Sequence, residues 1–179
     1  MLSLENTMLL IVDVQGNLAQ AMYEKDFLIE NLKKIIKGAH VFGIPILVTE
    51  QIPEKLGPTT PELAELLTGV QPIHKSSFSC CDDEGFMKEL KSINRGQILA
   101  TGIEAHVCVY QTTIDLIDLG YEVSLVADCV SSRTLMNKTI GTESMTNKGA
   151  KLTSTEMALF ELMKIAEGDN FSKMIKIVK

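Results

Sequence analysis

Three side chains with complementary chemistry, a carboxylate, an ammonium and a thiol, each stand where a short apolar run ends. Asp13 follows MLLIV, Lys75 ends QPIHK, and Cys108 comes shortly after QILATG, in the stretch GIEAHVC. Such a set could activate a thiol: the carboxylate can take the proton of the thiol, and the cation can pair with a partly buried carboxylate. That chemistry requires the fold to bring the three groups together.

Cys108 is the candidate nucleophile because the pattern places it in the first turn of a helix that follows a strand. At that position the helix dipole and the free N–H groups stabilise a thiolate, and the same N–H groups could bind an oxyanion. A thiol of lowered pKa should react with iodoacetamide faster than Cys80, Cys81 or Cys129. The alternative is a small buried side chain that packs the helix on the sheet.

Asp13 becomes the proton acceptor by elimination, because the three histidines are poorly placed for that role. His106 lies two residues before the cysteine and would point away from it on a helix, and His74 faces away from the side of its neighbour, the lysine. His40 lies near the end of an earlier helix. A strand-terminal aspartate can instead cap a turn, and a lysine is most often exposed, so both alternatives stay open.

The elements that must position these residues alternate between short apolar strands and helix-like segments. Strands are expected at residues 8–13, 46–50, 71–75, 97–102, 122–128 and 150–154. Helices are expected at about 25–42, 60–67, 83–90, 107–120, 131–149 (with weak periodicity), 153–166 and 171–178. Continuously apolar strands separated by helices favour a parallel sheet covered on both faces. The sequence therefore predicts a three-layer α/β/α sandwich, doubly wound, as one domain over residues 1–179.

In such sheets ligands bind beyond the carboxyl ends of the strands, near the point where the strand order switches. Asp13, Lys75 and the turn before Cys108 are all expected at that edge. We therefore expect the three side chains to converge there.

Composition and missing motifs exclude several other functions. The chain has 179 residues, 45% of them apolar and 22% charged, with a net charge of −6 and scattered lysines, which argues against a nucleic-acid partner. No apolar run approaches the length that a bilayer requires, and the N-terminus lacks signal-peptide features. The four cysteines form no disulfide or zinc pattern, so free thiols and a cytoplasmic location are expected. Neither GxGxxG nor GxxxxGK[ST] occurs, and no cofactor is expected.

The three residues, taken with their surrounding motifs, resemble the isochorismatase-like cysteine hydrolase superfamily. LLIVDVQ, HKSSF and TGIEAHVCV match its Asp–Lys–Cys triad in order and spacing, over nearly the whole chain. VTEQIPEKLGPTTPEL and KSSFSC further resemble the subgroup called isochorismatase-domain-containing proteins, whose substrates are largely unassigned. The resemblance implies a six-stranded parallel sheet and a non-proline cis peptide at Ile103–Glu104. It also implies an oxyanion hole made by the backbone N–H groups of Glu104 and Cys108.

The departures from the family pattern narrow the expected chemistry. Isochorismatases proper generally lack the cysteine, so its presence points to cleavage of an amide-like C–N bond through a thioester. Nicotinamidases of the family carry metal-binding histidines after the second strand, whereas this chain has TEQIPEKLG there, so no metal is expected. Gln15, Gln51, Phe78 and His106 are candidates to line the pocket of a small-molecule substrate, and a surface or packing role is an alternative for each.

Two other functions remain possible from the sequence. The chain could be a non-catalytic binding or assembly protein that retains the fold, since fold does not fix function. A flavodoxin-like or receiver-like signalling domain fits less well, because no adjacent acidic pair follows the first strand and the chain is long. Family members commonly assemble, so a homo-oligomer is expected.

Overall fold

A computed structural model describes all 179 residues and contains a six-stranded sheet in the order β3-β2-β1-β4-β5-β6, with every neighbouring pair parallel. The strands are β1 (Thr7–Val12), β2 (Ile46–Gln51), β3 (Ile73–Lys75), β4 (Gln97–Ile103), β5 (Glu122–Ser131) and β6 (Lys151–Thr153). The expected doubly wound α/β fold is confirmed.

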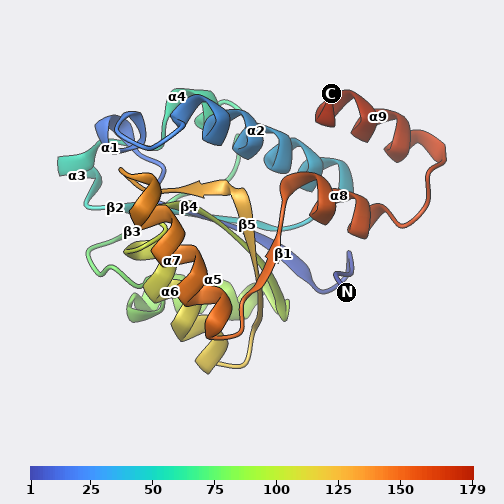
Figure 1. The fold of residues 1–179 in the computed structure, drawn as a ribbon. Coiled ribbons are helices and arrows are strands. Elements are labelled where there is room, and N and C mark those ends of the chain that lie inside the picture. Colours follow the sequence, from blue (N-terminus) through green and yellow to red (C-terminus); the bar gives the residue numbers. More distant parts are fainter.

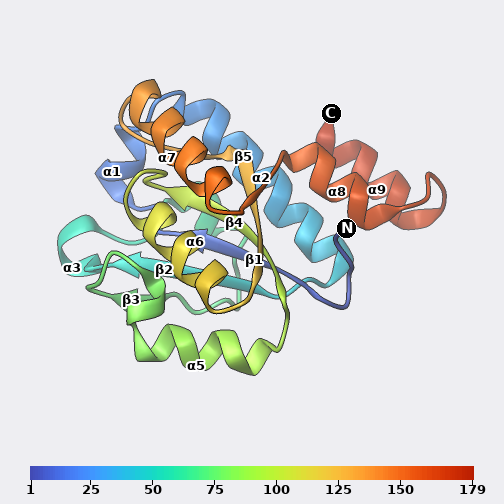
Figure 2. The same ribbon diagram turned by 60° about the horizontal axis from the view of Figure 1, so that its bottom comes forward.

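Helices cover both faces of the sheet, as Figures 1 and 2 show. On one face lie α2 (Lys25–Phe42), α4 (Pro61–Ala64), α8 (Thr155–Met163) and α9 (Gly168–Val178); on the other lie α5 (Glu84–Ile93), α6 (Cys108–Asp118) and α7 (Leu135–Asn147). Two short helices, α1 (Gly16–Gln20) and α3 (Pro53–Leu56), follow β1 and β2 and lie together at the carboxyl edge, on the left of Figure 1. A 3-10 turn spans Cys80–Asp82.

The central strand β1 shows why the strands are apolar without alternation. Leu9 and Ile11 pack into the core beneath α2 and α8, whereas Met8, Leu10 and Val12 pack into the core beneath α5 and α6. All six residues of β1 are buried. A strand buried on both faces has no polar side, so its pattern carries no period of two.

The strand order switches between β1 and β4, and Gly102 allows these two strands to approach closely there. A Cβ atom on Gly102 would lie 2.1 Å from the backbone oxygen of Val12, and Gly102 has φ +110°. A larger residue would clash with β1 and would also be strained in this backbone conformation. Glycine at this position therefore lets the end of β4 lie against the end of β1, next to Asp13.

Several element boundaries differ from the sequence prediction. Strand β5 continues to Ser131, past the expected end at Asp128, because its pairing with β4 shifts register after Ala100. Asp128 instead accepts hydrogen bonds from the backbone N and the hydroxyl of Thr155 at the start of α8. The N-cap of α8 is Ser154, whose hydroxyl accepts from Met157 N.

Candidate active site

The structure brings Asp13, Lys75 and Cys108 together at the carboxyl edge of the sheet. Asp13 directly follows β1, Lys75 is the last residue of β3, and Cys108 is the first residue of α6. Lys75 Nζ lies 2.6 Å from Asp13 Oδ2, and the two side chains are 0% and 1% exposed. An ion pair this thoroughly removed from water requires good geometry to form at all, because both charges lose their hydration.

Asp13 is held by more than the ammonium. Its second carboxylate oxygen, Oδ1, accepts a 2.7 Å hydrogen bond from the hydroxyl of Thr49, a buried residue of β2. The Asp13 backbone has φ +52°, a left-handed conformation that aspartate tolerates better than most residues. Both carboxylate oxygens therefore have a fixed donor, and the orientation of the carboxylate is set.

Lys75 is also fully surrounded by acceptors. Besides Asp13, its ammonium donates to the backbone oxygens of Ser77 at 3.0 Å and Phe78 at 3.3 Å. Burial alone would lower the pKa of Lys75, but the charge of Asp13, aided by the nearby thiols, outweighs burial and raises it. The ammonium consequently stays charged across the neutral pH range.

The thiol of Cys108 is buried beside this ion pair and its pKa is raised, contrary to the lowered value expected from the sequence. Burial is the main cause, the negative charge of Asp13 adds to it, and the charge of Lys75 opposes both. The lowered pKa was expected from the helix start alone, without the effect of burial and of the Asp13 charge on the thiol. The resting thiol is therefore protonated, with the Asp13 carboxylate near enough to raise its pKa.

Three backbone N–H groups in the turn before α6 have no acceptor within the chain: those of Glu104, His106 and Cys108. The neighbouring amide of Ala105 donates to Ser131 O at 2.8 Å, and the amides of Val107 and Val109 donate to Glu104 O. The peptide bond Ile103–Glu104 is cis. The family resemblance implied two of these three donors, Glu104 and Cys108, for an oxyanion hole.

The four candidate pocket residues have different surroundings. Gln51 lies beside Cys108, whose thiol donates a hydrogen bond to Gln51 Oε1 at 3.5 Å. Gln15 is fully buried; its amide donates to the backbone of Gln51 and Gly57, and its carbonyl accepts from Gln51 N. Gln15 thus fastens the loop after β2, a structural role that the sequence analysis named only as an alternative.

The other two pocket candidates are Phe78 and His106. The side chain of Phe78 is half exposed, and only its backbone oxygen contacts the triad, through Lys75. His106 lies on the nucleophile turn, where its Nδ1 is 2.9 Å from the hydroxyl of Ser132 at the end of β5. Neither side chain contacts Cys108.

The sequence reasoning missed several residues that shape this edge. Glu50 is buried and accepts from Thr59 N at 2.6 Å and from Thr59 Oγ1 at 2.7 Å, which fastens the loop after β2. Arg133, just beyond β5, pairs with Glu104 at 2.9 Å. Glu50 could have been found from the polar residues that end an otherwise apolar strand. Arg133 could not, because the predicted end of β5 was three residues too early.

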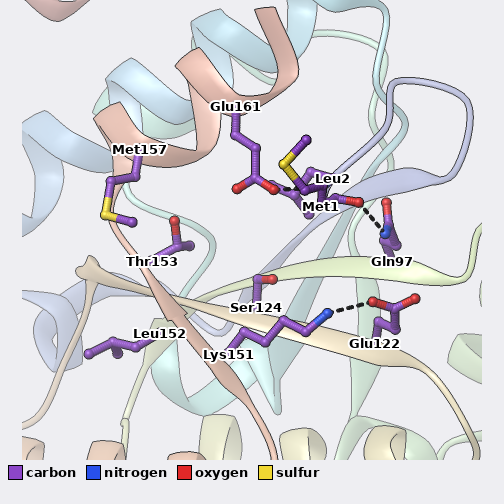
Figure 3. A pocket seen from close by; sticks show the side chains of 10 residues that line it. All are labelled: Met1, Leu2, Gln97, Glu122, Ser124, Lys151, Leu152, Thr153, Met157 and Glu161. Atoms are coloured by element: carbon purple, nitrogen blue, oxygen red, sulfur yellow. Dashed lines mark hydrogen bonds and ion pairs between the residues drawn. The ribbon is translucent and has the colours of Figure 1, made fainter. Parts of the chain in front are cut away.

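Five surface hollows lie away from Asp13, Lys75 and Cys108, none of which lines them. Figure 3 shows one of about 180 Å³ at the opposite edge, where β4, β5 and β6 begin, bordered by Glu161 of α8 and by the Lys151–Glu122 ion pair. Asp13, Lys75 and Cys108 are themselves buried. No group of three or more potential metal ligands gathers anywhere, and no helix has the length and apolarity needed to cross a bilayer.

Comparison with known proteins gives consistent matches over the chain. The isochorismatase domain model matches residues 7–157. Isochorismatase domain-containing protein 2 of Danio rerio is 33% identical over 178 residues, covering 99% of this chain and 89% of that protein. Among solved structures, MAR1 ribonuclease from Caenorhabditis elegans has a TM-score of 0.93 and 32% identity, covering 99% of this chain and 91% of its own.

A more distant structure shares the fold. The YcaC gene product from Escherichia coli, described as an octameric hydrolase of unknown specificity, has a TM-score of 0.93 at 23% identity. The match covers 98% of this chain and 88% of that one.

Proposed function

This chain belongs to the isochorismatase family, and we propose that it is a cysteine hydrolase that cleaves an amide-like C–N bond of a small molecule. The observation that carries this proposal is the buried Asp13–Lys75 ion pair beside the thiol of Cys108 at the first turn of α6. The pair supplies a base and a cation within reach of one nucleophile. Cys80 also lies near both charges, but it is completely buried, and only Cys108 stands at the start of α6 beside the free amides.

The first step is transfer of the thiol proton to Asp13 as Cys108 Sγ attacks the carbonyl carbon of the substrate. The transfer turns a carboxylate and a thiol into a carboxylic acid and a thiolate, so the charge of the cluster does not change. Lys75 stays charged and passes from pairing with the carboxylate to stabilising the sulfur. This explains how a thiol of raised pKa can act as a nucleophile at neutral pH.

The carbonyl oxygen becomes an oxyanion, which the free amides of Glu104 and Cys108 would bind. One donor of this kind is typically worth about 3–4 kcal/mol in the transition state. Asp13 then protonates the leaving nitrogen, and the C–N bond breaks to leave a thioester on Cys108. Asp13 next takes a proton from water, whose oxygen attacks the thioester, and the released thiolate regains that proton from Asp13.

Hydroxylamine tests the thioester with the unmodified enzyme. A panel of small amides, ureides and nitriles is incubated with the protein and hydroxylamine, and the products are separated by liquid chromatography and mass spectrometry. We expect the acyl group of each hydrolysed amide to appear partly as its hydroxamate, because hydroxylamine competes with water for the acyl-enzyme. Hydrolysis without any hydroxamate at saturating hydroxylamine contradicts a covalent intermediate.

RNA belongs in that panel because a similar structure is named a ribonuclease. We expect no RNA cleavage, since the chain carries a net charge of −6 and binding of the phosphate backbone relies on clustered cations. Cleavage of RNA at a rate that depends on Cys108 would replace the amide proposal. A protein without turnover of any kind would instead be the binding or assembly module considered above.

We also propose that the protein forms a homo-oligomer and works in the reducing cytoplasm. The nucleophile is a free thiol, as are the other three cysteines, and such thiols persist where disulfides are reduced. Leu135, Met136 and Ile140 of α7 expose more than half of their surface, a feature that favours burial against another copy. A related fold is octameric. Light scattering should give a mass of at least two chains, and a monomer at micromolar concentration contradicts this.

A further inference from the structure

We propose that Thr49 is a positioning residue for the reaction: its hydroxyl holds the Asp13 carboxylate in the orientation that accepts the thiol proton. This inference rests on the proposed function and adds a fourth residue to its machinery. Thr49 lies in β2, opposite Val12 in the register of β1, so the residue before Asp13 pairs with it directly. The pairing of β1 with β2 therefore keeps the Thr49 hydroxyl close to the Asp13 carboxylate.

The geometry leaves Asp13 little freedom to rotate. Lys75 donates to Oδ2 at 2.6 Å and Thr49 donates to Oδ1 at 2.7 Å, so a donor is fixed on each oxygen. Without Thr49, the carboxylate could turn about its Cβ–Cγ bond while it kept the ammonium contact. A turned carboxylate would no longer present a lone pair to Cys108, and a misplacement of about 1 Å can cost about 100-fold in rate.

A second contact sets the direction of the Thr49 hydroxyl. Cys80 Sγ lies 3.7 Å from Thr49 Oγ1 and is placed to donate to it. The pKa of Cys80 is raised to about 11, chiefly by burial, so this thiol keeps its proton at neutral pH. Thr49 thus receives a hydrogen bond from Cys80 and gives its own proton to Asp13. Cys80, which takes no part in the proposed mechanism, is thus the first donor in a series of two hydrogen bonds that ends at Asp13.

A neutral hydroxyl suits this position better than a second cation. Asp13 has to gain a proton during the reaction, and two cations would hold it in the ionised form. A hydroxyl orients the carboxylate with weaker stabilisation of its charge. The groups that face Asp13 are then one ammonium, from Lys75 on β3, the Thr49 hydroxyl on β2, and the thiols of Cys80 and Cys108.

The test compares Thr49→Val, which keeps the shape and loses the hydroxyl, with Thr49→Ser, which keeps the hydroxyl. We expect Thr49→Val to lower kcat about 10- to 100-fold with KM within about twofold of the wild type, because the change affects a proton acceptor and not substrate binding. Thr49→Ser should recover most of kcat.

Thr101→Val is the matched control. Thr101 is also fully buried in a central strand, but its hydroxyl donates to the backbone oxygen of Leu10 and not to a triad residue. We expect this variant to keep the wild-type kcat and pH profile. An equal loss in Thr101→Val and Thr49→Val would mean that any buried strand threonine has the effect, and would overturn the positioning role.

A second readout needs no substrate and separates this inference from the proposed function. The rate at which acrylamide alkylates Cys108 is followed by peptide mass spectrometry from pH 5 to 9. Thr49→Val should slow it at least about fivefold, because the base is no longer aimed at the thiol. If the Thr49→Val variant does not fold, Thr49→Ala is used in its place. If Thr49→Val leaves both the alkylation rate and kcat unchanged, the positioning role of Thr49 is overturned. If Asp13→Asn is alkylated at Cys108 as fast as the wild type, the function proposed above is overturned instead.

Discussion

Replacement of Cys108 by alanine should abolish hydrolysis of every amide that the wild-type protein turns over, lowering kcat by about 10⁴-fold or more. In the proposed mechanism the thiol forms the covalent bond, and neither the Thr49 hydroxyl nor the fully buried Cys80 thiol near the Asp13–Lys75 pair replaces it. The free amides of Glu104 and Cys108 would remain, so substrate binding should persist with little change in affinity. Initial rates on the panel of small amides, ureides and nitriles measure the first effect, and calorimetric titration measures the second.

Cys81→Ser is the control for this experiment. Cys81 is the most exposed of the four cysteines and lies outside the triad, so its loss should leave kcat within about twofold of the wild type. Turnover by Cys108→Ala at the wild-type rate would remove the nucleophile from the account. In that case the buried cluster would have a structural role, and the binding or assembly alternative would stand.

Replacement of Lys75 by methionine should lower the free energy of unfolding by about 3–5 kcal/mol, because it leaves the Asp13 carboxylate buried without its partner. The double variant Asp13→Asn with Lys75→Met should recover most of that loss, since neither charge remains. Urea denaturation at neutral pH measures both. Lys88→Met, at an exposed position of α5, serves as the control and should change stability by less than about 0.5 kcal/mol.

The pH dependence of this loss follows from the raised pKa of Lys75. As the pH rises, the unfolded chain releases this proton first, near 10.5, while the folded chain retains it. The stabilisation from the ion pair is therefore fully present below about pH 10 and is lost as the pH rises through the folded pKa. The difference between the wild type and Lys75→Met should be flat from pH 7 to 9 and shrink at more alkaline pH. A difference that grows with alkaline pH would contradict the charge pairing.

The convergence of the triad could be predicted because it depends only on the parallel topology. Asp13 and Lys75 end apolar strands, and the carboxyl ends of parallel strands share an edge. The partner of Asp13 on its other oxygen could not be predicted, because the pairing of Thr49 with Val12 depends on the register of β1 and β2. Both strands are buried on both faces, so no polar side fixes that register.

The helix predicted weakly at residues 131–149 is confirmed as α7, although its sequence is rich in polar residues and has no clear apolar face. Gly141 lies directly against the backbone of Ala105, a tertiary contact that the local pattern does not show.

Other predictions were wrong where the local pattern carries little information. Gln15 looked like a free amide at a strand end, but loop backbone that no local pattern could place saturates it. The raised pKa of Cys108 likewise depends on tertiary contact with Asp13.

The central claim is that Cys108 forms a bond to the substrate, and the mass of the protein during turnover tests it most directly. The wild-type chain is mixed with a hydrolysed amide, quenched in acid within milliseconds, digested and analysed by mass spectrometry. The account predicts that the peptide containing Cys108 gains the mass of the acyl group and loses it at the rate of product formation. An acyl group on another residue, or none while product accumulates in a burst, would contradict the account.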